Sequence, residues 1–247
     1  MRRALLGLVA AVGLAAQDWP APVVERVMGD RDFVLLLDRG TGFSRWSRGL
    51  DPAFTAPPCS TFKLPHALVA LEVGVIQAET ALTCRPAECH AAHGTLKVAE
   101  AIRVSCVSFF RQTARRLGAA RMAQGLARLG YPGAGSLRPL DGFWLDGAFR
   151  IGPDQQLAWI RRFYTEPLGV APAHLYLVRG ASRLERAGGW EVAGKTGSSR
   201  QGLGWFAGQI TRGGEVAWVV VLLRGAGATG REAERRLRGL LEGEVRP

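Results

Sequence analysis

Short apolar segments bounded by turn residues near both ends of the chain predict β-strands. The segment 32–38 (DFVLLLD) is one of them, and the glycine-containing residues 39–42 predict a turn into a second strand. Three more segments of this kind lie toward the other end, at 190–196, 204–210 and 215–224. We expect these strands to form one antiparallel sheet that begins with a β-hairpin.

The middle of the chain follows a helical period instead. From Thr61 to about Ile76, leucine and valine recur at helical spacing, and Gly74 marks the approaching end of the helix. Similar patterns predict further helices over 95–105, 107–117, 119–129 and 154–163. Over residues 230–243, leucines gather on one helical face with arginines opposite, so this helix is expected to cover the sheet.

Strands at both ends around a helical middle predict an α+β fold. We expect an antiparallel β-sheet flanked by N- and C-terminal helices, with an inserted all-helical region. Residues 17–57 and 188–247 are assigned to the sheet part, and residues 58–187 to the helical part. A functional site is expected where the two parts meet.

The first residues have the layout of a secretory signal peptide. In segment 1–16, two arginines precede an apolar stretch that ends in small residues before the polar Gln17. An uncleaved N-terminal anchor is the alternative. Because charges interrupt every other hydrophobic stretch, we expect a mature protein of residues 17–247, periplasmic or secreted, without stable membrane insertion.

The four cysteines of an exported chain permit two disulfides and three connectivities. Cys84 and Cys89 would close a short loop, and Cys59 and Cys106 could form a second bridge if the serines beside them share a site. Cys84, Cys89 and the nearby histidines His90 and His93 could instead bind zinc. We expect no metal site, because an oxidising compartment favours cystine and the spacing matches no common zinc pattern.

The formal net charge of +11 raises the question of a nucleic-acid partner. Arginines are spread from Arg2 to Arg246 without a basic block, and no aromatic-interleaved RNA-binding motif occurs. We therefore expect no nucleic acid as a partner. A solvated basic surface of this kind favours anionic substrates mildly.

Ser60 and Lys63 stand together at the start of the predicted helix that follows Pro57-Pro58-Cys59. Three residues apart on a helix, the hydroxyl and the amine lie on one face and can touch. The helix N-terminus adds partial positive charge and N–H groups that would favour a developing alkoxide. The alternative is that Ser60 only caps the helix.

Lys195-Thr196-Gly197 ends a predicted strand, where a lysine could bind a substrate carboxylate and a glycine lets a ligand approach the backbone. Of the 32 basic residues, only Lys63, Lys97 and Lys195 are lysines. The chemistry at both motif positions should therefore need an amine that can lose its proton, which arginine cannot supply.

A second hydroxyl candidate is Ser105 in Ser105-Cys106-Val107, between two predicted helices. It could relay a proton to a leaving group, or it could simply cap a helix.

Four motifs thus occur in order along the chain: Ser60-x-x-Lys63, Ser105-x-Val107, Phe143-Trp144-Leu145-Asp146-Gly147 and Lys195-Thr196-Gly197. In order and rough spacing they resemble the class D serine β-lactamases, the oxacillinase type. The resemblance covers nearly all of residues 17–247 and implies the serine β-lactamase and penicillin-binding transpeptidase fold. It also implies hydrolysis of the β-lactam ring of penicillin-type antibiotics, and hence antibiotic resistance.

The absence of asparagine separates this chain from other serine β-lactamases and penicillin-binding proteins. Class A enzymes usually carry an asparagine in the middle motif and use a glutamate with a nearby asparagine to position the deacylating water. This chain contains no asparagine, so another base must activate water. In class D enzymes that base is the motif lysine after reaction with carbon dioxide, which requires a neutral amine in an apolar pocket.

The resemblance implies a role for each motif residue. Ser60 would be the acylating nucleophile, and Lys63, carboxylated by carbon dioxide or bicarbonate, the general base for acylation and deacylation. Ser105 and Lys195 would relay protons and position the substrate. Phe62, Val107 and Leu145 would wall the lysine pocket, where the indole N–H of Trp144 would bond the carbamate.

The remaining carried-over roles concern substrate binding. Thr196 and Gly197 would bind the substrate, and the backbone N–H groups of Ser60 and Ser198 would form the oxyanion hole. An arginine usually binds the substrate carboxylate in this family. We assign this role to Arg231, with Arg224 as the second choice.

Two departures from the family concern the substrate range. Tyr131-Pro132-Gly133 replaces the common Tyr-Gly-Asn, so any contact from that asparagine is missing. Ser198 replaces a frequent aromatic residue, and the segment from there to Trp205 is short.

Two other functions are the alternatives. A penicillin-binding sensor or transpeptidase-like protein would be acylated at Ser60 but would barely release the product. A basic binding module without catalysis would be retained on nucleic acid at physiological salt.

Overall fold

The computed structural model describes residues 19–88, 94–184 and 186–243. The predicted signal peptide and the possible zinc ligands Cys89, His90 and His93 lie outside the described residues. Within the described ranges, no helix has both the length and the apolar character needed to cross a membrane.

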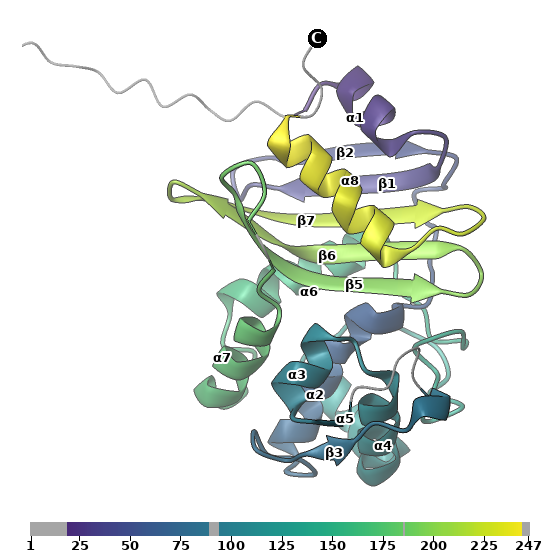
Figure 1. The fold of residues 1–247 in the computed structure, drawn as a ribbon, viewed down its shortest axis with the longest axis vertical. Coiled ribbons are helices and arrows are strands. Elements are labelled where there is room, and N and C mark those ends of the chain that lie inside the picture. The colour runs from purple at the N-terminus through teal and green to yellow at the C-terminus, as the bar shows by residue number, and fades with distance from the viewer. Residues whose placement is uncertain (1–18, 89–93, 185, 244–247) are drawn as a thin grey trace, which may run out of the picture.

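Five strands form one antiparallel sheet in the order β2-β1-β7-β6-β5, which confirms the predicted α+β fold (Figure 1). The strands are β1 (Asp32–Asp38), β2 (Phe43–Arg48), β5 (Glu191–Ser199), β6 (Leu203–Arg212) and β7 (Glu215–Arg224). Residues from the two ends of the chain meet in its centre, because β1 pairs with β7 and places Leu35 opposite Val221. Strand β5 forms the edge of the sheet that lies nearest the helical part.

Helices α1 (Ala21–Met28) and α8 (Gly230–Glu242) cover one face of the sheet (Figure 1). Leu35 on this face shares a buried core with Met28 and Leu237. The alternate residues of β1, such as Leu36, belong to the core on the opposite face. Strand β1 is therefore buried on both faces, which explains why its sequence is a continuous apolar run rather than an alternating one.

The opposite face of the sheet packs against the helical part through one continuous core. Its helices are α2 (Lys63–Glu72), α3 (Val98–Arg103), α4 (Val107–Leu117), α5 (Ala119–Arg128), α6 (Pro153–Thr165) and α7 (Pro172–Ala181). Two 3₁₀ turns, Cys59–Phe62 and Pro86–Glu88, and a small sheet of β3 (Leu82–Thr83) and β4 (Thr95–Leu96) complete the described elements.

Two predicted helix boundaries are wrong. The helix expected from Thr61 to Ile76 is a 3₁₀ turn followed by α2, which ends at Glu72. The helix expected over 95–105 begins only at Val98, because Thr95 and Leu96 pair with β3 and so have extended backbone.

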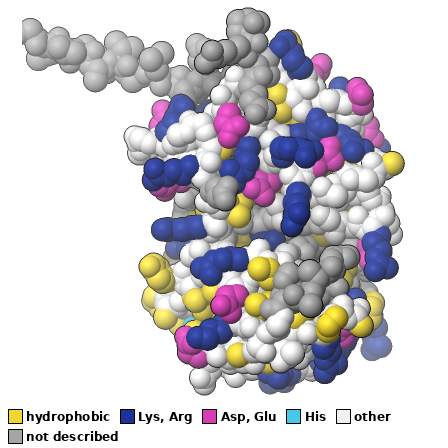
Figure 2. Space-filling model, in the orientation of Figure 1, with side chains coloured by type: hydrophobic (Ala, Val, Ile, Leu, Met, Phe, Trp, Pro, Cys, Tyr) yellow, Lys and Arg dark blue, Asp and Glu magenta, His cyan; other side chains and the backbone are white. Residues whose placement is uncertain are grey.

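Positive charge is distributed over the surface rather than concentrated. Figure 2 shows Lys and Arg side chains across the whole visible face, with acidic side chains between them. Many arginines take part in ion pairs, among them Arg31 with Glu232, Arg45 with Asp154 and Arg161 with Asp38.

Candidate active site

The structure brings Ser60, Lys63 and Ser105 together in one hydrogen-bonded group. The Nζ atom of Lys63 lies 2.6 Å from Ser60 Oγ and 3.0 Å from both the Oγ and the carbonyl oxygen of Ser105. Lys63 itself is completely buried. Two hydroxyl groups from distant parts of the sequence therefore meet at one buried amine, where protons can pass between them.

Ser60 lies in the 3₁₀ turn that precedes α2, and this turn is fixed from several sides. Cys59 has a φ of +51°, a left-handed conformation that is unusual for a residue other than glycine. Its N–H donates to Trp144 O at 2.7 Å, and Thr61 N–H donates to Pro58 O at 3.2 Å. Strained backbone of this kind persists only where the surroundings determine it, as they do at this turn.

Ser105 lies in a second left-handed turn, with a φ of +57°, between α3 and α4. The capping position of α4 is occupied by Cys106, whose Sγ accepts from Phe109 N at 3.4 Å. At the start of α2 the capping residue is Phe62, and no side-chain capping bond occurs there. Neither Ser60 nor Ser105 serves as a helix cap, so both hydroxyl groups are left to the Lys63 amine.

The prediction that Cys59 and Cys106 could form a disulfide is wrong. Cys59 Sγ is within 3.4 Å of Pro57 O and 3.6 Å of Leu145 O, whereas Cys106 Sγ lies 3.4 Å from Cys84 Sγ. No disulfide joins the three cysteines that the structure describes. The two serines do share a site, but their neighbours' side chains point into different parts of the core.

Lys195 lies on β5, with 5% of its surface exposed. Its strand partner Ala207 belongs to the core shared with the helices, so Lys195 faces the helical part of the fold. Nζ donates to Thr196 O at 3.2 Å and to Thr196 Oγ1 at 3.4 Å. Burial lowers the pKa of Lys195 to about 8, against the opposing effect of the Glu234 carboxylate.

Gly197 lets β5 approach the 3₁₀ turn that carries Ser60 closely. A Cβ atom at this position would lie 3.0 Å from Pro58 O and 3.1 Å from Ser60 N. Next to it, Ser198 Oγ accepts from Gly230 N at 2.9 Å, which ties the end of β5 to the start of α8. The backbone of residues 197–198 is thereby held beside Ser60, as an oxyanion hole between the two requires.

A cleft of about 680 Å³ opens in front of these residues. This volume is within the range of small-molecule sites. Arg111, Arg200 and Arg231 give its rim positive charge, against the carboxylates of Glu88 and Asp146. Eight of the residues predicted for the site line it: Ser60, Ser105, Val107, Leu145, Thr196, Gly197, Ser198 and Arg231.

The two arginines considered for a substrate carboxylate occupy different places. Arg231 lies in the first turn of α8 and lines the cleft. Arg224 lies outside it and is held by Asp32, with Nη2 2.7 Å from Asp32 Oδ2, and by the carbonyl oxygen of Gly49 at 3.0 Å. Of these two arginines, Arg231 is the one that the fold makes available to a molecule bound in the cleft.

Trp144 is fully buried beside the Lys63 pocket. Its ring stacks on Phe62 at a centroid distance of 5.8 Å and meets the edge of His66 at 5.4 Å. Its Nε1 atom is buried and has no hydrogen-bond partner among the described residues. Buried N–H groups are rarely left unpaired, so this donor requires an explanation.

Sequence reasoning missed the inner wall of the pocket. Phe110 lies 5.7 Å from Lys63 Nζ, measured to the ring centroid, and also contacts His66. Burial, and to a smaller extent the charge of Lys63, lower the pKa of His66 to about 3. The available signal was the spacing, because His66 follows Lys63 by three residues and so lies on the same side of α2.

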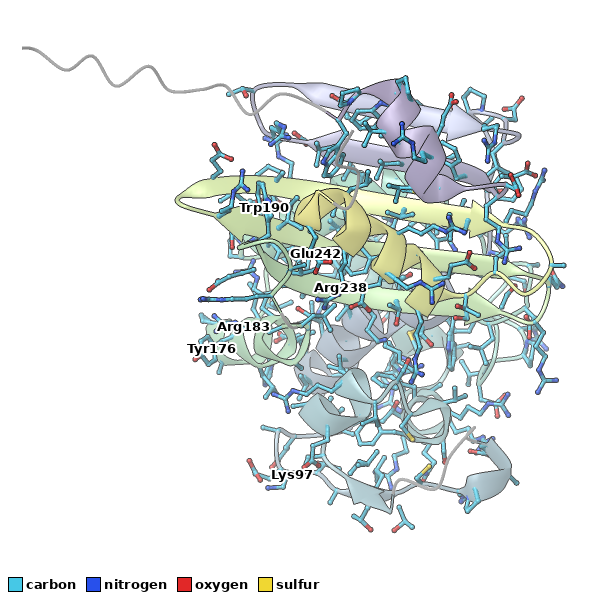
Figure 3. All side chains as sticks on the ribbon, turned by 45° about the horizontal axis from the view of Figure 1, so that its top comes forward. Lys97, Tyr176, Arg183, Trp190, Arg238 and Glu242 are labelled. Carbon is cyan, nitrogen blue, oxygen red and sulfur yellow. The ribbon has the colours of Figure 1, made fainter. Side chains whose placement is uncertain are left out.

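A second cleft, of about 750 Å³, lies between α7 and β5 and contains none of the predicted site residues. Tyr176 in α7 and Arg183 just after this helix both line the cleft, and Figure 3 labels both side chains.

Comparisons with known proteins agree with this geometry. Residues 53–167 match the family model described as the penicillin-binding protein transpeptidase domain. The β-lactamase OXA-5 of Pseudomonas aeruginosa is 33% identical over 64% of this chain and 63% of its own length. OXA-48 of Klebsiella pneumoniae is 30% identical over 68% of this chain and 65% of its own length. The match therefore spans slightly less than two thirds of these curated relatives.

Solved structures extend the similarity over most of the fold. The class D β-lactamase YbXI from Nostoc has 28% identity and a TM-score of 0.72, covering 85% of this chain and 94% of its own. The class D β-lactamase BAT-2 superimposes with a TM-score of 0.80 at 24% identity, covering 91% and 97%. The fold is that of these class D β-lactamase structures. In sequence, the chain is similar to class D serine β-lactamases over about two thirds of its length.

Proposed function

We propose that this protein hydrolyses the β-lactam ring of penicillin-type antibiotics through an acyl-enzyme on Ser60, and so gives antibiotic resistance. One observation carries the proposal, namely the 2.6 Å contact between Ser60 Oγ and the buried amine of Lys63 at the floor of the cleft. The similarity to class D β-lactamases supports the choice of substrate.

In the acylation step, Ser60 Oγ forms a bond to the lactam carbonyl carbon and gives its hydroxyl proton to the Lys63 side chain, 2.6 Å away. The negative charge on the carbonyl oxygen is stabilised by the N–H groups of Ser60 and Ser198, which the close approach at Gly197 holds together. The carbon–nitrogen bond then breaks. The ring nitrogen takes a proton through Ser105, whose Oγ is 3.0 Å from Lys63 Nζ.

In the deacylation step, a water oxygen bonds to the ester carbon and the bond to Ser60 Oγ breaks. One water proton passes to Ser60 Oγ, the other is released to solvent, and the opened product leaves as a carboxylate. Carbon dioxide bound to the Lys63 amine as a carbamate would supply the base for both steps. Two features of the site support this: the amine is fully buried beside aromatic rings, and the Trp144 Nε1 donor beside it has no partner among the described residues.

Substrate binding is assigned to charge and to the β5 edge. The carboxylate of a penicillin would be held by the guanidinium of Arg231, with Thr196 and Ser198 beside it in the cleft. The positive charge of Lys195, buried behind Thr196, adds to the attraction.

A chromogenic cephalosporin tests the proposal against a sensor or transpeptidase that is acylated but barely deacylates. Steady turnover, lost in Ser60→Ala, is the expected result. A single burst without turnover would assign the protein to the sensor group. If mass spectrometry of the protein mixed with penicillin shows no covalent adduct and the antibiotic stays intact, the proposal is wrong altogether.

The proposed place of action is the periplasm or the outside of the cell, after removal of residues 1–16. The signal-like layout of that segment supports it. Mass spectrometry of the exported protein should find a chain that begins near Gln17.

A further inference from the structure

Two buried ring nitrogens beside the Lys63 pocket have no hydrogen-bond partner among the described residues. One is Trp144 Nε1, and the other is His66 Nδ1. Both side chains are completely buried, so bulk solvent does not reach these nitrogens. An unpaired buried polar group is destabilising, and two of them in adjacent rings indicate that something else bonds there.

The rings that carry these nitrogens border the same space as the lysine amine. His66 and Trp144 meet edge to face at a centroid distance of 5.4 Å. His66 also meets Phe110 at 5.1 Å, and Lys63 Nζ is 5.7 Å from the centroid of that Phe110 ring. Because His66 is three residues after Lys63 on α2, both side chains leave the helix on one side.

The hydrogen bond of His66 Nε2 shows how Nδ1, on the other side of the ring, can become a donor toward the Lys63 pocket. Nε2 lies 3.1 Å from Thr113 Oγ1, and the Thr113 hydroxyl also lies 3.0 Å from Phe110 O. If Thr113 donates to Phe110 O, His66 carries its proton on Nε2 and Nδ1 is a bare acceptor. If Thr113 donates to Nε2 instead, the proton is on Nδ1, which then becomes a donor.

His66 stays neutral in either arrangement, because burial lowers its pKa to about 3. The ring therefore has one N–H group at working pH, and the Thr113 hydroxyl determines its side. An anion beside Nδ1 would favour the arrangement with the proton on Nδ1.

We infer that His66 is a second hydrogen-bond donor to carboxylated Lys63, so that His66 Nδ1–H and Trp144 Nε1–H together bind the two oxygens of the carbamate. This inference rests on the proposed function, which includes that carbamate. In its formation, the Lys63 nitrogen bonds to the carbon of carbon dioxide and loses one proton to solvent. The new group has two oxygens, and beside the pocket lie two unpaired ring nitrogens, of which His66 Nδ1 is a donor when it carries the proton.

Titration with ¹³C-bicarbonate, followed by the NMR signal of the carbamate carbon, measures this directly without substrate. In His66→Phe the ring remains but both nitrogens are lost, and bicarbonate affinity should fall roughly 10- to 100-fold, as expected for a lost bond to an ionised group. His66→Asn restores a donor and should recover part of the affinity. His174→Phe is the matched control, because His174 lies outside the pocket and pairs with Glu72, and its affinity should equal that of the wild type.

The tautomer of His66 gives a second readout that a merely structural role would not change. In ¹⁵N NMR of the wild-type protein, bicarbonate should move the proton of His66 from Nε2 to Nδ1. The signal is assigned by its loss in His66→Phe or His66→Asn, since the chain has only four histidines. If His66→Phe fails to fold, Thr113→Val is the substitute test. It removes the hydroxyl that donates to Nε2 and should therefore also weaken carboxylation.

The outcomes separate the two levels of the argument. If the wild-type protein turns over antibiotic but forms no carbamate, the proposed base is wrong and the role of His66 with it. If the carbamate forms and His66→Phe binds bicarbonate as tightly as the wild type, only the inference about His66 is overturned. A His66 proton that is on Nε2 in the carboxylated protein overturns it as well.

Discussion

Replacing Trp144 by phenylalanine should weaken bicarbonate binding, and with it the stabilisation of the folded protein by bicarbonate. The change removes the unpaired Nε1–H but keeps an aromatic ring against Phe62. Without bicarbonate, removal of a buried unsatisfied donor offsets part of the packing lost with the smaller ring. With bicarbonate, the variant loses a hydrogen bond to an ionised group of about 1.5–3 kcal/mol, or roughly 10- to 150-fold in bicarbonate affinity.

The size of the stabilisation by bicarbonate follows from the linkage between ligand binding and unfolding. At a bicarbonate concentration of about 100 times the wild-type Kd, the wild-type protein should gain about 2.7 kcal/mol of unfolding free energy. A variant with about 10- to 100-fold weaker binding should gain only about 1.4 to 0.4 kcal/mol at the same concentration. For a chain of this length, the wild-type gain corresponds to a rise in Tm of roughly 5–10 °C.

Thermal unfolding with and without bicarbonate measures this difference, and trapping of the acyl-enzyme measures its consequence for catalysis. Deacylation should slow more than acylation in Trp144→Phe. The matched control is Trp159→Phe, because Trp159 is also buried with an unpaired Nε1 but stacks on Phe163, away from the catalytic group. Equal bicarbonate stabilisation of Trp144→Phe and the wild type would refute the reasoning.

Two further predictions concern charge. The pKa of Lys195 is about 8 in the folded protein, below the usual value near 10.5, so its charged form destabilises the fold fully below pH 8 and this penalty disappears as pH rises toward 10.5. A pH series of kcat/KM should therefore fall above about pH 8 as the Lys195 charge is lost, and a profile flat to pH 10 would contradict the assigned role. Arg231→Ala should raise KM for penicillins roughly 10-fold or more by loss of a charge-assisted contact. Arg224→Ala, which breaks the pair with Asp32 and the bond to Gly49 O outside the cleft, should leave KM unchanged, and equal KM values for the two variants would contradict the assignment.

The long elements of the fold could be predicted from the sequence because their burial patterns are strong. Strands β1 and β7 are continuous apolar runs, and α8 carries leucines on one face, so each has a clear signal. The short strand pair β3–β4 has two residues in each strand, too few for any period to appear. Helix α7 was not predicted, although Pro172 in its first turn is a common start signal.

The site was predictable only as far as its motifs extend. Ser60, Lys63 and Ser105 meet as expected, because one pair is spaced by a helical turn and the third is in a recognisable motif. The contacts of His66 and Thr113 join residues 47 positions apart, and no local pattern indicates such a pairing. The cysteine bridge failed because proximity in sequence to two meeting serines says nothing about where the neighbouring side chains point.

The pairing of β1 with β7 determines when this protein can finish folding. Asp32 and Arg224, bonded across that pair, are 192 residues apart. During synthesis, the apolar segment of β1 emerges long before β7, the strand that pairs with it on the side away from β2. Until then, this edge of β1 has unpaired backbone groups and can associate with other chains. Such distant pairing also makes folding slow. A chain shortened before β7 would therefore be prone to aggregation rather than merely inactive.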